Sequence, residues 1–218
     1  PSPSRSLKLK LVGCPICEET RLPFWSLKPR AIKESRNVFG FPVYHSPYPG
    51  FEECDFHRLR VTVCPRCFYA SSRIEDFIVQ AGEPFQKDRV MIRKLWDHSC
   101  PELKKTLNEL PSRFGTHLRT NDEAVLSYKI AIQTLTIMDE LQPDQDTKLE
   151  LLTLGLLCSE KLEKLGRSEE SLEQKIETLK RIGDPTSGLD KANRIRVIFW
   201  KCLLELETGQ KKKASISL

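Results

Sequence analysis

Two short cysteine motifs of the same form constrain this chain more than any other feature. They are Cys14-Pro15-Ile16-Cys17 and Cys64-Pro65-Arg66-Cys67. In each motif two thiols lie on a tight turn in which proline fixes one backbone angle, so both sulfur atoms can face a single ion. Two such turns complete a tetrahedral zinc site of four thiolates, which leaves no position open for water or substrate. The sequence therefore predicts one structural zinc ion bound by all four cysteines.

A redox-active pair and a disulfide framework are the alternatives to zinc. A thioredoxin-type CxxC motif opens a helix after a buried strand, whereas Cys14 follows the basic segment 7–13 and the motif occurs twice. The other four of the eight cysteines are scattered. This pattern favours metal ligands plus buried thiols in a reducing cytoplasm. Zinc is the favoured interpretation, and disulfides remain the main alternative.

The distance between the two motifs indicates a folded insert. The 46 residues between them exceed the usual spacing of about 15–20. Segments 7–11 and 56–63 alternate apolar with polar residues and predict strands that lead into the motifs. The aromatic segment 38–45 is interrupted by glycine and proline, and a loop follows it. We expect residues 1–80 to form a small, β-rich, zinc-ribbon-like lobe.

Residues 81–210 have the apolar spacing of helices. The expected helices cover residues 90–96, 103–110, 121–142, 151–165, 168–182 and 189–206. Asn121 is expected to cap the helix that it begins. Because short loops join the later helices, we expect antiparallel hairpins. The predicted fold class is α+β, mainly α, with a basic flexible tail over 211–218.

Four of these helices have apolar stripes that we expect to face inward. The stripe of the helix at 121–142 is Ala124, Tyr128, Ala131, Leu135 and Met138, and that of the helix at 151–165 is Leu151, Leu152, Gly155, Cys158, Leu162 and Leu165. The stripe of the helix at 168–182 is Leu172, Ile176, Leu179 and Ile182, and that of the last helix is Leu189, Ala192, Ile195, Phe199, Cys202 and Leu206.

Part of the helical region resembles a tetratricopeptide repeat. Leu154-Gly155, Leu165-Gly166, Ser168-Glu169-Glu170 and Pro185 follow the order of such a repeat: helix, glycine turn, partner helix, proline. The small-aromatic-small spacing around Tyr128 is also typical of its second helix. The helix after the glycine turn departs from this spacing, because its corresponding residues Ser171, Lys175 and Thr178 are polar. The resemblance implies an array of helical hairpins.

Most of the chain also resembles an uncharacterised bacterial family, domain of unknown function 2225. The resemblance rests on CPIC near the start, a long insert, CPRCFYA, Asp76-Phe77 and the segment SYKIAI at 127–132. Members usually have glycine where this chain has Phe68, and glycine would permit a left-handed turn. Phe68 therefore implies a slightly different turn or an added role in packing. The resemblance supports zinc and helices and lends no activity.

Composition bounds the class of function. The net charge of +5, from 35 basic and 30 acidic residues, is a modest excess. Dedicated nucleic-acid binders usually concentrate such an excess on one face. No apolar run reaches the roughly 20 residues of a membrane span, and no signal-type segment follows the N-terminus. We expect a cytoplasmic protein, although the first residue, Pro1, leaves room for a short preceding leader or linker.

A non-enzymatic assembly module fits these features best. Zinc would stiffen the lobe, and the helical array would present a surface to a protein partner. The alternative is nucleic-acid binding by the lobe, with bases stacked on Phe39, Phe41 and Tyr44. The residues expected to contact phosphates are Lys28, Arg30, Lys33, Arg36, Arg58, Arg60 and Arg66. A solvated basic rim over an aromatic core is the plainer interpretation of the same residues.

An enzyme is the least expected class, because the sequence lacks the common catalytic and phosphate-binding motifs and indicates no small-molecule substrate. Cys54 with His57, and His98 with Cys100, raise the question of a second metal site or a nucleophile. A partly buried thiol beside a surface imidazole is the favoured explanation of the first pair. The remaining thiols, Cys158 and Cys202, fall on apolar helix faces, where a cysteine outside any disulfide behaves as a small hydrophobic residue.

Overall fold

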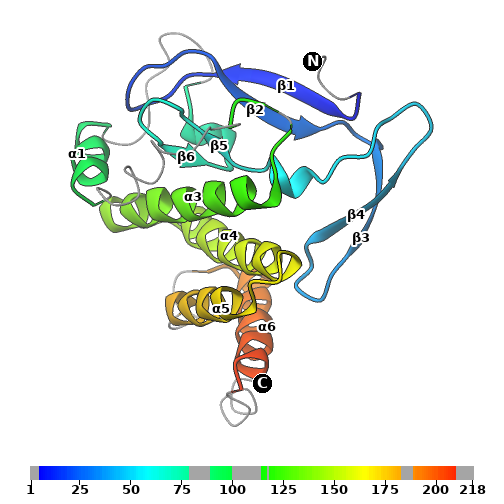
Figure 1. Ribbon diagram of the computed structural model, residues 1–218. Helices are drawn as coiled ribbons and strands as arrows, with labels where there is room; N and C mark the ends of the chain where they lie inside the picture. Colours follow the sequence, from blue (N-terminus) through cyan, green and yellow to red (C-terminus); the bar gives the residue numbers. More distant parts are fainter. Residues whose placement is uncertain (1–4, 79–88, 100–113, 117, 183–188, 210–218) are drawn as a thin grey trace. The chain divides into compact units, whose positions relative to one another are not determined.

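The computed structural model describes residues 5–78, 89–99, 114–116, 118–182 and 189–209. Short strands occupy the first part of the chain and helices the rest (Figure 1). The strands are β1 (Leu7–Val12), β2 (Leu22–Leu27), β3 (Ile32–Arg36), β4 (Pro42–Pro47), β5 (Thr62–Val63) and β6 (Ala70–Ser71). The helices are α1 (Arg89–Ser99), α3 (Asn121–Leu141), α4 (Gln145–Lys164), α5 (Ser168–Ile182) and α6 (Lys191–Glu207). The predicted class, α+β and mainly α, is confirmed.

The strands form separate antiparallel pairs, β1–β2, β3–β4 and β5–β6. In the first pair Leu9 lies opposite Trp25 and Leu11 lies opposite Pro23. Because side chains alternate across a strand, these apolar residues share one face. At its buried end, Leu7 and Trp25 pack with Leu59. The strand predicted over 7–11 is therefore confirmed, with one apolar face that is only partly buried.

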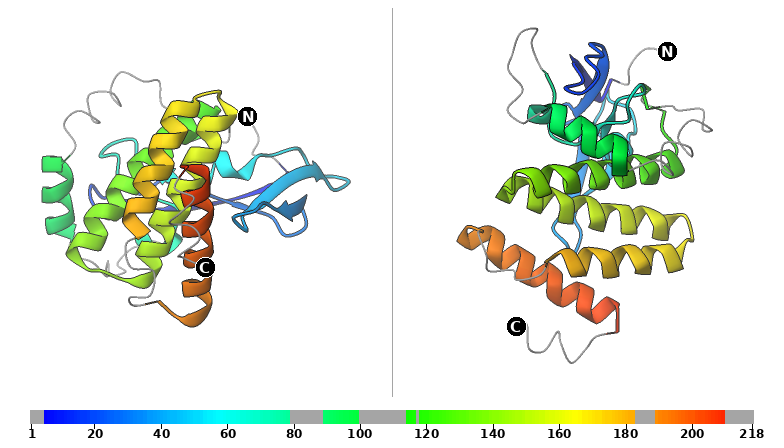
Figure 2. Two further views of the ribbon diagram at one scale, coloured as in Figure 1. Left: turned by 90° about the horizontal axis from the view of Figure 1, so that it is seen from below. Right: turned by 90° about the vertical axis from the view of Figure 1, so that its left-hand side faces the viewer.

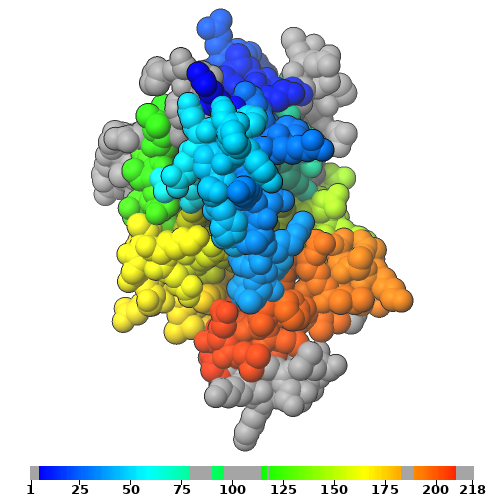
Figure 3. Space-filling view, turned by 90° about the vertical axis from the view of Figure 1, so that its right-hand side faces the viewer, coloured from blue at the N-terminus to red at the C-terminus, as the bar shows by residue number. Residues whose placement is uncertain are grey.

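The second pair, β3–β4, is a hairpin at the molecular surface (Figure 3). Its turn lies in the aromatic segment that the sequence marked as interrupted. The side-chain oxygen of Asn37 accepts hydrogen bonds from the backbone N–H groups of Phe39 and Phe41, at 3.0 and 2.9 Å. Gly40 takes a φ of 80°, which suits a residue without a β-carbon.

The strand predicted over 56–63 is wrong in its first half. Residues Phe56–Arg58 form a 3₁₀ turn, η1, and only Thr62–Val63 pair as a strand. The local reason is Asp55, whose carboxylate accepts a hydrogen bond from the His57 N–H at 3.2 Å and caps the turn. An acceptor side chain placed just before a turn competes with an extended backbone in this way.

The chain divides into two compact units, residues 1–137 and 138–218. Sequence patterns placed this division at residue 80, whereas in the structure most of α3 belongs with the strands. The Tyr128 hydroxyl in α3 donates a hydrogen bond to the carbonyl oxygen of His57. Six residues after Tyr128 in α3, the Thr134 hydroxyl oxygen accepts a hydrogen bond from the Ala70 N–H at 3.4 Å.

A buried arginine just before α3 also ties the first unit together. The Arg119 guanidinium is almost fully buried and donates hydrogen bonds to the carbonyl oxygens of Val61 and Phe114, at 2.6 and 2.7 Å. Burial lowers the pKa of Arg119 to about 10. The group is still protonated at neutral pH, so a cation here is stabilised by backbone carbonyls.

The helices predicted at α3 and α4 are confirmed, with changes at both starts: α4 begins at Gln145, six residues before the expected position, and the cap of α3 differs. The apolar stripe of α3 is buried along its whole length, and so is that of α4 up to Leu162. The cap of α3 is Thr120 rather than Asn121. The Thr120 hydroxyl oxygen accepts a hydrogen bond from the Glu123 N–H, and the Glu123 carboxylate accepts one from the Thr120 N–H. This reciprocal pair is a capping box.

The stripes predicted for α5 and α6 are wrong in part. In α5 the buried side chains are Ser171, Thr178 and Ile182, whereas Leu172 is exposed. In α6 the buried residues are Val197, Trp200, Cys202, Leu204 and Glu205. Of the six predicted inward residues near α6, only Leu189 and Cys202 are buried, and Ala192, Ile195, Phe199 and Leu206 are exposed.

Some expectations lie outside the described residues, among them the helix over 103–110 and the tail over 211–218. The described helices of the second unit pack as expected for hairpins: α4 and α5 run side by side in opposite directions, and α6 packs on α5 (Figure 2). None of the described helices combines the length and the apolar composition that a membrane span needs.

Candidate metal centre

The two cysteine motifs fold into turns of the same backbone form. In the first, the Glu18 N–H donates to the carbonyl oxygen of Cys14 at 3.1 Å, and the Cys14 N–H donates to the carbonyl oxygen of Glu19 at 2.7 Å. In the second, the Phe68 N–H donates to the carbonyl oxygen of Cys64 at 2.9 Å, and the Cys64 N–H donates to the carbonyl oxygen of Tyr69 at 2.9 Å. Each turn thus directs two sulfur atoms to one side.

The four cysteine sulfur atoms form a single cluster. The Sγ atoms of Cys14 and Cys67 lie 3.5 Å apart, as do those of Cys17 and Cys64, and all four lie within 4.8 Å of one another. Disulfide bonding needs about 2.0 Å, so no disulfide joins these cysteines. A tetrahedral zinc ion with bonds of about 2.3 Å to sulfur requires sulfur–sulfur distances of about 3.8 Å. The arrangement fits one metal ion with four sulfur ligands.

The electrostatics of the cluster favour a cation. Hydrogen bonds from Cys14 and Cys67 lower the pKa of the Cys64 thiol. The hydrogen bond with Cys64 raises the pKa of Cys14, and the one with Cys14 raises the pKa of Cys67. One thiolate is therefore stabilised by neighbours that keep their protons. A divalent metal ion would stabilise all four thiolates together, and its binding would release the remaining protons.

Two residues hold the turns in a left-handed conformation. Glu18 and Phe68 both have a φ of 62°, and each directly follows the last cysteine of its motif. The sequence offered two explanations for phenylalanine at 68, a different turn or a role in packing. The turn is the left-handed one that glycine would permit, and the Phe68 side chain is buried. The role in packing is thus the one that the structure supports.

Residues behind the second motif support it with buried polar contacts. The Asp76 carboxylate accepts hydrogen bonds from the Ser71 hydroxyl at 2.6 Å and from the Arg73 guanidinium at 2.9 Å. Its backbone carbonyl accepts one from the Tyr69 hydroxyl at 3.1 Å. Phe77 packs against the Tyr69 ring, with centroids 5.7 Å apart. The sequence singled out Asp76-Phe77 only through the family resemblance, and the structure gives both residues a supporting role.

The other candidate ligands do not join this cluster. Among the described residues, the four cysteines are the one group of His, Cys, Asp or Glu side chains placed to share a metal ion. Cys54 packs beside Leu7, Trp25 and Leu59, and burial raises the pKa of its thiol to about 11. The imidazole of His57 is buried and not at the surface as expected, with Nε2 2.6 Å from the carbonyl oxygen of Pro42. Both have roles in packing. The side chains of His98 and Cys100 lie outside the described residues.

The basic residues of the nucleic-acid hypothesis are divided between exposed and half-buried positions. Lys28, Arg30, Lys33 and Arg36 are exposed, whereas Arg58 and Arg60 are half-buried. The aromatic side chains expected to stack on bases are engaged in the lobe itself. Phe41 is buried and stacks with Phe39, and the Tyr44 ring lies 4.9 Å from that of His57.

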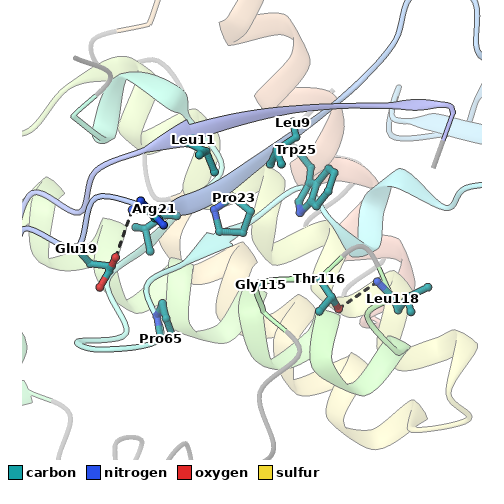
Figure 4. A pocket seen from close by; sticks show the side chains of 11 residues that line it. Leu9, Leu11, Glu19, Arg21, Pro23, Trp25, Pro65, Gly115, Thr116 and Leu118 are labelled. Atoms are coloured by element: carbon teal, nitrogen blue, oxygen red, sulfur yellow. Dashed lines mark hydrogen bonds between the residues drawn. The ribbon is translucent and has the colours of Figure 1, made fainter. Parts of the chain in front are cut away.

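A groove of about 490 Å³ lies between the apolar face of β1–β2 and the segment before α3 (Figure 4). It is lined mainly by apolar side chains, among them Leu9, Leu11, Trp25 and Leu118, with Pro65 of the second cysteine motif on one side. The polar groups at its edge are few. This groove explains why the β1 face is only partly buried.

The comparison with known families accounts for nearly the whole chain. Residues 7–218 match the model of an uncharacterised protein family conserved in bacteria, domain of unknown function 2225. The chain belongs to this family. Neither a curated protein nor a solved structure is similar to it at a significant level. In this member of domain of unknown function 2225, the four-cysteine cluster is the feature of the described residues with the clearest chemistry.

Proposed function

We propose that this protein is a non-enzymatic assembly module in which one structural zinc ion stabilises the first unit and the helices of the second unit bind a protein partner. The four sulfur atoms at tetrahedral spacing support zinc. A metal ion with four protein ligands has no open coordination position for a substrate, so the ion would have a structural role. In such small sites the free energy of metal binding is also free energy of folding.

The observation that carries the binding proposal is an exposed apolar surface on α6. Ile195 is 60% exposed, Phe199 is 48% exposed and Leu206 is 49% exposed. Large apolar side chains grouped on one helix face are typical of a surface that binds protein. Helices α4 and α5 approach closely, because a β-carbon added at Gly155 would lie 2.3 Å from the hydroxyl oxygen of Thr178. This approach supports the tetratricopeptide-like interpretation, and arrays of that kind present extended surfaces to peptides and proteins.

Affinity purification from the native host, with elemental analysis, tests this proposal. The bait is the tagged full chain, and a second bait carries Phe199→Glu. Val38→Glu is the matched control, because Val38 is also an exposed apolar residue but lies in the β3–β4 turn. We expect one zinc per chain and a protein that the wild-type and Val38→Glu baits retain and the Phe199→Glu bait loses.

Nuclease treatment distinguishes the alternative. A partner that resists nuclease supports the assembly module. Recovery that depends on nucleic acid, and that falls when the exposed Lys33 and Arg36 are replaced by glutamate, would instead favour nucleic-acid binding by the first unit. Substoichiometric zinc in freshly purified protein would remove the metal part of the proposal.

A further inference from the structure

Helix α6 is apolar on two opposite faces. Val197, Trp200 and Leu204 are buried and lie together on one face. The outer stripe, as we call the opposite face, consists of Ala192, Ile195, Phe199, Leu203 and Leu206. At about 100° per residue, this stripe is centred roughly opposite the buried face. An apolar face that stays exposed, opposite a buried one, is suited to a second packing contact.

The spacing of the outer stripe matches a helix–helix contact. Its residues follow one another at steps of three and four, the spacing at which side chains line up along one side of a helix. Such a seam packs against another helix by inserting side chains between those of the partner. Among the described helices α6 is the last, and it packs on α5 (Figure 2). The outer stripe is therefore suited to a second helix.

The charges beside the stripe indicate which helix fits. Lys191 and Arg196 flank its first half, and Glu207 flanks its second half. Two parallel copies of α6 would place like charges at the same level. In an antiparallel pair the basic half of one copy faces the acidic half of the other. Opposite charges across an interface favour the antiparallel arrangement and disfavour the parallel one.

The stripe is also self-complementary in register about Phe199. With a two-fold axis beside Phe199, Ile195 is level with Leu203 of the second copy, because both lie four residues from the centre. Ala192 is level with Leu206 of the second copy, each at seven residues. Small Ala192 thus meets large Leu206, and the stripe has an apolar side chain at every level.

One pair of opposite charges falls beside this seam. Arg196 and Glu207 lie on the same flank of the stripe, and an antiparallel two-fold keeps matching flanks together. Their levels differ by five residues, or about 7.5 Å along the axis, which two long side chains can span. One oxygen of the Glu207 carboxylate lies 2.9 Å from Nζ of Lys175. A carboxylate has two acceptor oxygens, so Glu207 can bind a second cation such as Arg196 of the second copy.

We propose that the outer stripe of α6 binds the outer stripe of a second copy of this chain, antiparallel and about a two-fold axis. Such an interface is isologous, with the same residues on both sides. The inference rests on the proposed function, because it names the partner of the same helical surface.

Analytical ultracentrifugation of the zinc-loaded full chain tests the dimer. We expect the weight-average mass of the wild type to rise from monomer to dimer with concentration, whereas Phe199→Glu and Ile195→Glu remain monomers. Both side chains are exposed in the single chain, so these variants should keep wild-type circular dichroism and melting. Val38→Glu, with the same change at an exposed site far from α6 in sequence, should dimerise like the wild type.

A charge exchange tests the antiparallel arrangement. Arg196→Glu and Glu207→Lys should each weaken dimerisation, by roughly tenfold at low salt, because each variant places two like-charged pairs at the interface. An equimolar mixture of the two variants should dimerise again, since the glutamate introduced in one chain then meets the lysine introduced in the other. A mixture no tighter than either variant alone would overturn the antiparallel pairing.

The outcomes for the dimer and for the proposed function are distinct. A wild type that is monomeric at every concentration, or a dimer that both glutamate variants leave intact, overturns this inference. If the wild type is monomeric but the affinity experiment still recovers another protein that Phe199→Glu loses, the assembly function stands with a different partner. If neither experiment shows an effect of Phe199→Glu, both proposals fail.

Discussion

Glu18 and Phe68 occupy the same position in the two cysteine turns, yet their side chains differ in what they contribute. Both backbones are left-handed, a conformation that is unfavourable for residues with a β-carbon. Phe68 is buried, and the packing of its ring compensates for this cost. Glu18 is exposed and buries no comparable surface. The first turn therefore carries backbone strain that a glycine would remove.

We predict that Glu18→Gly stabilises the zinc-loaded protein. Removal of the β-carbon from a left-handed residue stabilises the folded state by about 1 kcal/mol. The greater freedom of glycine in the unfolded chain offsets part of this gain, so the free energy of unfolding should rise by about 0.5–1 kcal/mol. Urea unfolding followed by circular dichroism measures it. Glu18→Ala is the matched control, because it removes the same side chain and keeps the β-carbon. An equal gain from both variants would show that the carboxylate, rather than the backbone, is the cause.

Metal affinity should depend on pH through the protons of the cluster. Without metal, the pKa values of Cys14 and Cys67 are raised, so these thiols are protonated at neutral pH, whereas the lowered pKa of Cys64 favours its thiolate. Zinc must displace the protons that remain, so its affinity should rise with pH. Competition with a chromophoric chelator at several pH values would measure this. Affinity independent of pH from about 6 to 8 would argue against thiolate ligation.

The ligands could be predicted from the sequence because each motif is local, and its turn depends on residues within five positions. The supports of the site could not be predicted in this way. Arg119 donates to a carbonyl oxygen 58 residues earlier in the chain. Asp76 stabilises the second turn through Ser71 and Arg73, polar residues that are common in ordinary loops. Residue type alone does not identify such partners.

At the scale of helices, the contact between α4 and α5 is closer than their sequences suggest. A β-carbon added at Gly155 in α4 would lie 2.3 Å from the hydroxyl oxygen of Thr178 in α5 and 3.3 Å from its β-carbon. Ser171 lies on the same face of α5 and donates a hydrogen bond to the carbonyl oxygen of Ser159 at 2.9 Å. Small and hydrogen-bonded residues therefore form this interface in place of large apolar ones.

Gly155→Ala should consequently destabilise the protein. The gain in helix propensity, about 1 kcal/mol, is opposed by a clash that typically costs about 1–3 kcal/mol or more. Thermal unfolding should show a net loss. In Gly155→Ala/Thr178→Ala the clashing hydroxyl is gone, so the double variant should be more stable than Gly155→Ala alone. If Gly155→Ala is as stable as the wild type, the two helices are not in the close contact described.

The same contact explains which helices could be predicted correctly. In α3 and α4 large apolar residues fall mainly on one face, so the amphipathic pattern indicates the buried side. In α5 the buried face contains Ser171 and Thr178, whose hydroxyls are satisfied by backbone carbonyls. In α6 two faces are apolar, and the spacing of apolar residues does not distinguish the buried face from the outer stripe. Packing against neighbours decides both cases.

For the whole molecule, the division near the end of α3 has a consequence for how metal affects stability. The metal cluster lies in the first unit, residues 1–137, and α3 is bonded to that unit through Tyr128 and Thr134. Loss of the metal should therefore reach beyond the strands into α3. The helices of the second unit have their own buried residues, among them Leu154 and Trp200.

We predict that chelation of the metal opens the first unit and leaves the second folded. Hydrogen exchange followed by mass spectrometry on the full chain should show faster exchange over residues 7–78 and in the first half of α3. Protection in α4, α5 and α6 should be unchanged, because their backbone hydrogen bonds and packing do not involve the cysteine cluster. Cys64→Ser should show the same pattern without chelator, since removal of one partner disrupts a four-ligand site.

Cys202→Ser is the matched control, because Cys202 is a buried cysteine of the second unit and is outside the cluster. That variant should still respond to chelator in the first unit, as the wild type does. If exchange in α4–α6 rises together with that of the strands, the two units unfold as one, and the metal stabilises the whole chain. If exchange over residues 7–78 does not change on chelation, the cysteine turns are held by protein contacts alone, and a structural role for the metal is excluded.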